Sequence, residues 1–107
     1  MNCALTYASP MGMLEYNSSR PPIEVDDETL AHVKIVIGTK LRRLESFMMT
    51  WPADKKRSGR TTVWMNPAIP LVFEFDSNDV LSIAPSRIER MMGRLNSRGE
   101  LVLDDLS

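Results

Sequence analysis

The stretch VDDETLAHVKIVIGTKLRRL, residues 25–44, decides the fold. Acidic residues 26–28 favour the start of a helix, and the cations at 40, 42 and 43 favour its end, because each complements the partial charge there. The β-branched run 33–37 offers a strand as the rival interpretation. The caps and a long apolar stripe predict the helix instead. Members of the stripe recur at spacings of three and four, and they are Leu30, Val33, Ile37, Leu41 and Leu44.

Shorter segments on both sides of this helix predict strands. Residues 14–16 and 23–25 flank NSSRPP, whose composition is typical of a turn, so they predict a hairpin. Apolar and polar residues alternate over 46–51, which is the period of a strand. Two further runs, 61–65 and 71–75, are rich in β-branched and aromatic residues and predict two more strands.

The rest of the chain predicts a second helix and a last strand. Proline suits the first turn of a helix, so this helix begins near Pro85, ends over residues 96–99, and is followed by a strand at 101–103. Its apolar face comprises Ile88, Met91, Met92 and Leu95. The order ββ-α-βββ-α-β predicts an α+β fold, an antiparallel sheet of about four to six strands with two helices packed on it. We expect residues 11–107 to form one domain after a flexible extension at 1–10.

Bulk composition excludes several classes of protein. The chain has 107 residues, 43% of them apolar, and a net charge of −1, which suits one compact domain without a global attraction to polyanions. Cys3 is the single cysteine, so an internal disulfide cannot form, which suits a reducing compartment. No apolar run reaches the ~20 residues of a membrane-spanning helix, and the first ten residues lack the features of a secretory signal. We therefore expect a cytoplasmic protein that does not bind membranes.

Charge lies in alternating blocks along the chain. Residues 40–60 hold seven cations and two anions, whereas residues 61–86 hold three anions and no cation. The basic block includes the loop KKRSGR, and further arginines recur at helical spacing near the C-terminus. Because the pI is about 5.8, a solvated turn whose cations pair with the acids is the competing interpretation. Nucleic-acid binding would use the cations Lys55, Lys56, Arg57, Arg60, Arg42, Arg43, Arg87, Arg90 and Arg94.

Large side chains on the strands support an alternative, a protein-interaction or homodimer module that regulates or inhibits another protein. Alternation over residues 46–51 directs Met48 away from the core. If the odd-numbered residues of 61–65 face the core, Trp64 points outward. Strand tryptophans can also stack on bases, although tryptophan is mostly a core residue in a small domain. The interface hypothesis therefore names Met48, Trp51 and Trp64.

The arrangement of the cations distinguishes these two hypotheses. A single continuous basic face favours nucleic acid, because many phosphates would be contacted at once. An exposed apolar sheet face with scattered cations favours a protein partner or a second copy.

Catalytic chemistry has little support in the sequence. His32 is the single histidine, and a lone histidine on a helix is more often structural than a general base. Cys3 lies in the predicted extension, where a catalytic thiol is not expected. The sequence contains no phosphate-binding glycine-rich loop and no zinc-ligand cluster. We expect a non-enzymatic protein that needs no cofactor and no metal.

Three segments carry a resemblance to a known family. VIGTKLRRLESF (residues 36–47), then Trp51, then GRTTVW (residues 59–64) resemble short uncharacterised actinobacterial proteins. The resemblance runs from Met11 to about Leu103 and implies no catalytic residues. Genome labels sometimes call members ATP-dependent DNA ligases. That chemistry needs a lysine nucleophile in a Lys-x-Asp-Gly setting, and this sequence has no Asp-Gly pair, so we reject ligase activity for this chain.

Overall fold

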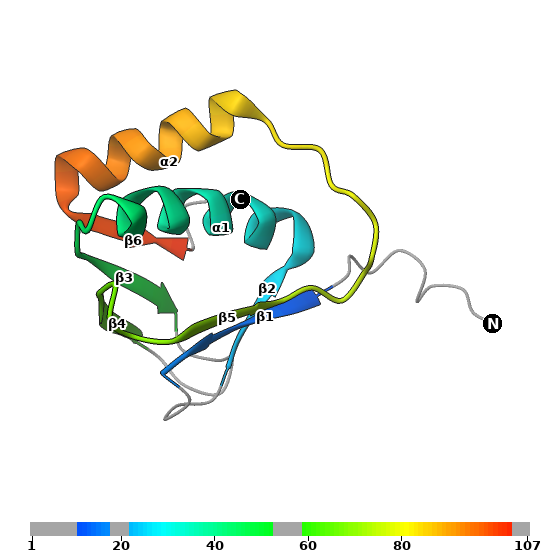
Figure 1. Cartoon of the computed structure of the whole chain (residues 1–107), viewed down its shortest axis with the longest axis horizontal. Helices are drawn as coiled ribbons and strands as arrows, with labels where there is room; N and C mark the ends of the chain where they lie inside the picture. Colours follow the sequence, from blue (N-terminus) through cyan, green and yellow to red (C-terminus); the bar gives the residue numbers. More distant parts are fainter. Residues whose placement is uncertain (1–10, 18–21, 53–58, 104–107) are drawn as a thin grey trace.

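The computed structural model describes residues 11–17, 22–52 and 59–103. Two predictions lie outside these ranges, the extension at residues 1–10 and the cations Lys55, Lys56 and Arg57. Two helices and six strands confirm the α+β class and follow one another in the predicted order (Figure 1). They are β1 (Met11–Tyr16), β2 (Ile23–Asp26), α1 (Asp27–Arg42), β3 (Phe47–Pro52), β4 (Arg60–Met65), β5 (Leu71–Glu74), α2 (Pro85–Arg98) and β6 (Glu100–Val102).

The strands form two three-stranded sheets, not the single antiparallel sheet that we predicted. The first sheet, β2-β1-β5, is antiparallel, and in the second sheet, β4-β3-β6, the strand β6 runs parallel to β3. Parallel neighbours need a long crossover, and the chain between β3 and β6 provides one because it includes β4, β5 and α2. Gly99 ends α2 with a φ of 71°, and its carbonyl accepts a hydrogen bond from the Met48 N–H at 3.2 Å. That bond starts β6 alongside β3.

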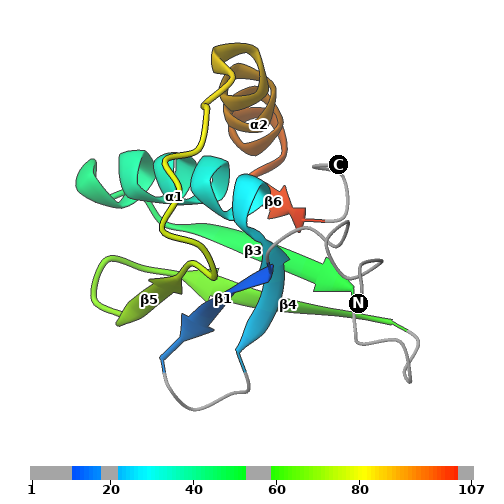
Figure 2. The same cartoon turned by 90° about the vertical axis from the view of Figure 1, so that its right-hand side faces the viewer.

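Helix α1 lies between α2 and strands β1 to β5, and β6 lies beside α1 (Figures 1 and 2). The Tyr16 hydroxyl donates a hydrogen bond to the backbone carbonyl of Trp64, which joins β1 to β4 and so links the two sheets. Side chains from both helices and both sheets share one core. Its buried apolar members are Leu14, Val25, Leu30, Val33, Val36, Ile37, Phe47, Met49, Met65, Met91, Leu95 and Leu101.

The two ends of α1 are capped in different ways. Asp26 is the N-cap, and its carboxylate accepts the Thr29 N–H at 3.0 Å, as the acidic start predicts. At the other end the Leu44 N–H bonds the Leu41 carbonyl and the Glu45 N–H bonds the Lys40 carbonyl, each at 3.0 Å, which is a Schellman motif. Leu44 occupies its left-handed position, with a φ of 59°, and is 78% exposed. Our assignment of Leu44 to the apolar stripe is therefore wrong, because the helix ends before it.

Helix α2 presents one apolar face to the core, as predicted. Met91 and Leu95 are buried, and Ile88 and Met92 are half-buried against the core. Pro85 occupies the first turn. Neither helix within the described ranges has the length and apolar content needed to cross a membrane.

Candidate binding surfaces

The outer face of the second sheet exposes two large apolar side chains beside each other. Phe47 and Met49 on β3 face the core, whereas Met48 between them is 46% exposed. Trp64 is the register partner of Met48 on β4 and is 51% exposed, which is the outward orientation considered from the sequence. Alternation assigns eight strand residues to this side. We call them the tryptophan face: Met48, Thr50, Pro52, Arg60, Thr62, Trp64, Glu100 and Val102.

The third residue of the interface hypothesis lies on the other side of the sheet. Trp51 follows Thr50 on β3 and therefore points toward the core side, where it is half-buried against the core cluster. The structure thus brings Met48 and Trp64 together but separates Trp51 from them.

A row of hydrogen-bonded side chains crosses the tryptophan face next to Trp64. Thr50 points outward but is only 2% exposed. Its hydroxyl donates to the carboxylate of Glu100 on β6, and its oxygen lies 2.7 Å from the hydroxyl oxygen of Thr62 on β4. Since Thr50 uses its proton on Glu100, Thr62 must donate to Thr50. Sequence reasoning missed this row, although Thr50 and Thr62 have the same alternation phase as Met48 and Trp64.

Two arginines stand at a polar hollow beside this row. The hollow has a volume of about 590 Å³. Arg60 begins β4 and Arg98 ends α2, and both residues are exposed. The carboxylate of Glu100 in the same hollow is already engaged by Thr50. Guanidinium groups bind carboxylates and phosphates well, so this hollow suits an anionic group.

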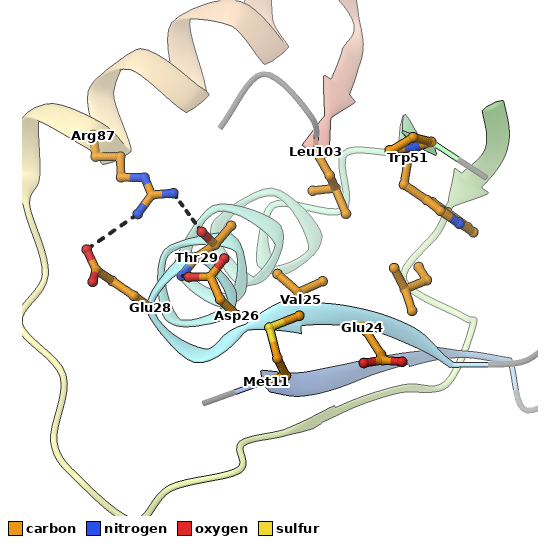
Figure 3. A pocket seen from close by; sticks show the side chains of 11 residues that line it. Met11, Glu24, Val25, Asp26, Glu28, Thr29, Trp51, Arg87 and Leu103 are labelled. Atoms are coloured by element: carbon orange, nitrogen blue, oxygen red, sulfur yellow. Dashed lines mark hydrogen bonds and ion pairs between the residues drawn. The ribbon is translucent and has the colours of Figure 1, made fainter. Parts of the chain in front are cut away.

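A second pocket, of about 520 Å³, opens on the opposite side of β3 (Figure 3). Arg87 forms its polar wall, donating to the Thr29 hydroxyl at 2.8 Å and lying 3.8 Å from the Glu28 carboxylate. Trp51 and Leu103 form part of its apolar wall. Arg87, Thr29 and Glu28 thus bind one another, while Glu24 and Asp26 place two further carboxylates at the wall of this pocket.

His32 connects the two helices. The ring is 1% exposed, and its Nε2 accepts the backbone N–H of Ala84 at 3.0 Å, just before α2. Nδ1 lies 2.7 Å from the carbonyl oxygen of Glu28 and must carry the proton that it donates. Both nitrogens are thus committed to the backbone. Within the described ranges, no cluster of three or more His, Cys, Asp or Glu side chains could hold a metal ion.

The predicted cations within the described ranges lie in separate places. Arg42 and Arg43 are exposed at the end of α1, while Arg90 and Arg94 are exposed on α2. Arg87 faces inward, with a side chain that is 16% exposed. Arg60, in contrast, belongs to the tryptophan face, and the helices cover the other side of that sheet.

The outer face of the first sheet has the opposite charge, which the sequence reasoning did not predict. Met13 on β1 is 43% exposed, and its register partners are Glu24 on β2 and Glu74 on β5. The seven strand positions on this side include four carboxylates and no lysine or arginine. We call them the acidic face: Met11, Met13, Glu15, Glu24, Asp26, Val72 and Glu74. Strict alternation of Met11, Met13 and Glu15 with the buried residues Gly12 and Leu14 was the signal that could have revealed it.

Comparisons with known proteins give one family. No curated protein and no solved structure matches the chain. The model of a domain of unknown function, DUF7882, matches residues 11–105, which include every strand and helix described above. The chain belongs to this DUF7882 family.

Proposed function

We propose that this chain is a non-enzymatic binding module whose tryptophan face binds a protein. The observation that carries the proposal is the pair of Met48 and Trp64, which are 46% and 51% exposed at partnered strand positions. Tryptophan and methionine are enriched at the centres of protein interfaces, and charged residues are typical of their rims. Here Arg60 and the hollow beside it supply such a rim.

The arrangement of the cations, the location of the protein and the question of ligase chemistry also bear on this proposal. The predicted cations favour a protein partner over a polyanion, because Arg42 and Arg43 lie at the end of α1, Arg90 and Arg94 lie on α2, and Arg60 alone of these lies on a strand. A cytoplasmic location fits a chain whose single cysteine cannot form an internal disulfide. Ligase chemistry is not part of the proposal, since the sequence lacks an Asp-Gly pair.

Site-specific photo-crosslinking tests the proposal. A photoreactive phenylalanine analogue would replace Trp64 in one variant and Val80 in a control, and Val80 is 99% exposed away from every sheet. We expect a discrete protein adduct at position 64 and none at position 80. Mass spectrometry of the adduct identifies the partner. Equal or absent labelling at the two positions would contradict a protein-binding role for this face.

Nucleic acid is the second candidate because one further observation favours it. Trp64, Thr62 and Arg60 project from the same side of β4, so an exposed ring stands four residues from a guanidinium group. Single strands bind by stacking bases on such rings while cations contact phosphates. The cations Lys55, Lys56 and Arg57 lie in the connection between β3 and β4, outside the described residues.

Fluorescence anisotropy with labelled single-stranded DNA, duplex DNA and RNA tests this candidate. Binding that falls steeply with salt, and that both Trp64→Ala and a Lys55/Lys56/Arg57→Glu triple variant abolish, would support it. Lys34→Ala is the matched control, because Lys34 is exposed on α1 and is not among the cations expected to contact nucleic acid. Failure to bind at low salt would remove nucleic acid as a ligand.

A further inference from the structure

We propose that the protein bound by the tryptophan face is a second copy of this chain, which presents its acidic face. This inference rests on the function proposed above and names its partner. The contact would join different surfaces of the two copies, so association is head-to-tail. Three features of the described residues carry it: charge, apolar content and size.

The two faces have complementary charge. On the acidic face, Glu24 and Glu74 are exposed on either side of Met13, and no lysine or arginine occupies a strand position of that face. On the tryptophan face, Arg60 is exposed, and Arg98 joins it at the polar hollow. The single carboxylate among the strand positions of that face, Glu100, accepts a hydrogen bond from Thr50, and the two guanidinium groups outnumber it. Opposed patches of this kind fix orientation and raise the rate of encounter.

Both faces also have an apolar centre of similar extent. Met11, Met13 and Val72 are 45%, 43% and 42% exposed on the acidic face. Met48 and Trp64 are exposed to a similar fraction on the tryptophan face. Methionine side chains adapt their shape to a partner, so a Met–Trp contact between copies needs little rearrangement. In the contact between copies, apolar side chains would lie opposite apolar ones and carboxylates opposite guanidinium groups.

The dimensions of the faces set the expected strength. Three strands about 4.8 Å apart, with about five residues at ~3.3 Å each, give a face of roughly 14 by 17 Å. That is about 240 Å² on each partner, smaller than the interfaces of stable complexes, so the contact would be weak and reversible. Strands β1 to β5 lie on the side of α1 away from α2, and β6 lies beside α1 (Figures 1 and 2). We therefore expect association in the micromolar range or weaker.

A charge-swap experiment tests the inference by sedimentation velocity from about 1 to about 300 µM. The first variant, Glu24→Lys/Glu74→Lys, reverses the acidic face. The second, Arg60→Glu/Thr62→Glu, reverses the tryptophan face at two exposed positions. Each alone would place like charges opposite each other, so we expect association at least about tenfold weaker than in the unmodified chain. An equimolar mixture brings the two reversed faces together and also the two unmodified faces, so opposite charges meet in both contacts and we expect association to be restored.

Controls separate these effects from misfolding. Arg90→Glu reverses an exposed charge on α2, away from both faces, and should leave association unchanged. Circular dichroism of each variant checks folding, and restoration by mixing itself requires both variants to be folded. A chain that stays monomeric to about 300 µM would overturn the inference, as would association that ignores both reversals or a mixture that does not recover.

The crosslinking experiment at position 64 distinguishes failure of this inference from failure of the proposed function. An adduct with a different protein, from a chain that is monomeric alone, leaves the tryptophan face as a protein-binding surface and removes the second copy as its partner. Absence of any adduct together with a monomeric chain overturns both proposals.

Discussion

The two sheets are held together by different kinds of contact. The first sheet depends on backbone fit: at Gly12 on β1, an added Cβ would lie 2.4 Å from the Glu74 carbonyl oxygen and 2.8 Å from the Asp27 carboxylate. Asp27 is 2% exposed, and its two oxygens accept the N–H groups of Asp76 and Ser77 at 3.0 and 2.9 Å. The second sheet depends on side chains, with the Thr62–Thr50–Glu100 row across its outer side.

This difference indicates where the molecule can tolerate change. A backbone contact leaves no room for an added atom, because neither a strand carbonyl nor a carboxylate held by two N–H groups can move cheaply. Side-chain contacts near solvent can be altered one group at a time. We therefore expect substitutions along β1 to change stability, and substitutions at the exposed positions of the tryptophan face to change binding.

The largest effect should follow from Gly12→Ala. The new methyl group would overlap the Glu74 carbonyl, the Asp27 carboxylate and the Leu30 side chain, all within 2.8 Å. We expect a loss of about 3 kcal/mol in the free energy of unfolding, measured by urea denaturation. The matched control is Gly38→Ala in α1, where a Cβ meets nothing within 4 Å. Alanine should raise stability there by about 0.5–1 kcal/mol, because it lowers the entropic cost of the helix. Equal effects at the two sites would contradict the close approach at Gly12.

The next effect should follow from Thr50→Val in the second sheet. The substitution keeps the shape of the side chain but removes the hydroxyl that donates to Glu100 and accepts from Thr62. A half-buried carboxylate then loses its donor, so we expect a loss of about 2 kcal/mol by urea denaturation. Thr62→Val is the control, since Thr62 is exposed and the bond from Thr50 to Glu100 survives; its cost should stay near 0.5 kcal/mol. A Thr50→Val protein as stable as the original would show that the row does not order the sheet.

Sequence reasoning predicted the elements better than their pairing. Periodicity located both helices and each strand within a few residues, because alternation and helical spacing are local. Pairing is not local, so the split into two sheets and the parallel position of β6 against β3 could not be read from the pattern.

The prediction of the binding surfaces was limited in the same way, because it lacked the pairing of the strands. The outward orientation of Trp64 followed from alternation alone, whereas its position beside Met48 required the β3–β4 register. Trp51 was grouped with them by residue type, and the alternation that directs Met48 outward directs Trp51 inward. The charge of the acidic face was missed because Glu74 on β5 is distant in the sequence from the carboxylates of β1 and β2.

A smaller effect, a gain in stability, is expected in the connection between α1 and β3. Leu44 has a φ of 59°, which strains the backbone of a residue with a side chain, and it is 78% exposed, so its side chain buries little apolar surface in return. Leu44→Gly should raise the free energy of unfolding by about 1 kcal/mol, because glycine adopts the left-handed conformation without strain. Leu44→Ala keeps a Cβ at the same φ and is the control. A glycine variant no more stable than the alanine variant would contradict the assigned Schellman motif.

The smallest effect is a pH dependence of stability that arises at Glu45, in the connection between α1 and β3. The Lys40 ammonium donates a hydrogen bond to the Glu45 carboxylate at 2.9 Å, and this bond lowers the Glu45 pKa from its ordinary value of 4.5, with Arg43 adding a weaker attraction. A pKa that is lower in the folded chain stabilises it at neutral pH, and this contribution disappears as pH falls through the folded pKa. Glu45→Gln should therefore be slightly less stable than the original chain at about pH 7, with a smaller deficit at about pH 3. Paired urea titrations at the two pH values measure this difference. Because the pair is exposed to solvent, added salt should also shrink it at neutral pH. A deficit that does not shrink in acid would instead reflect a role of the Glu45 side chain other than its charge.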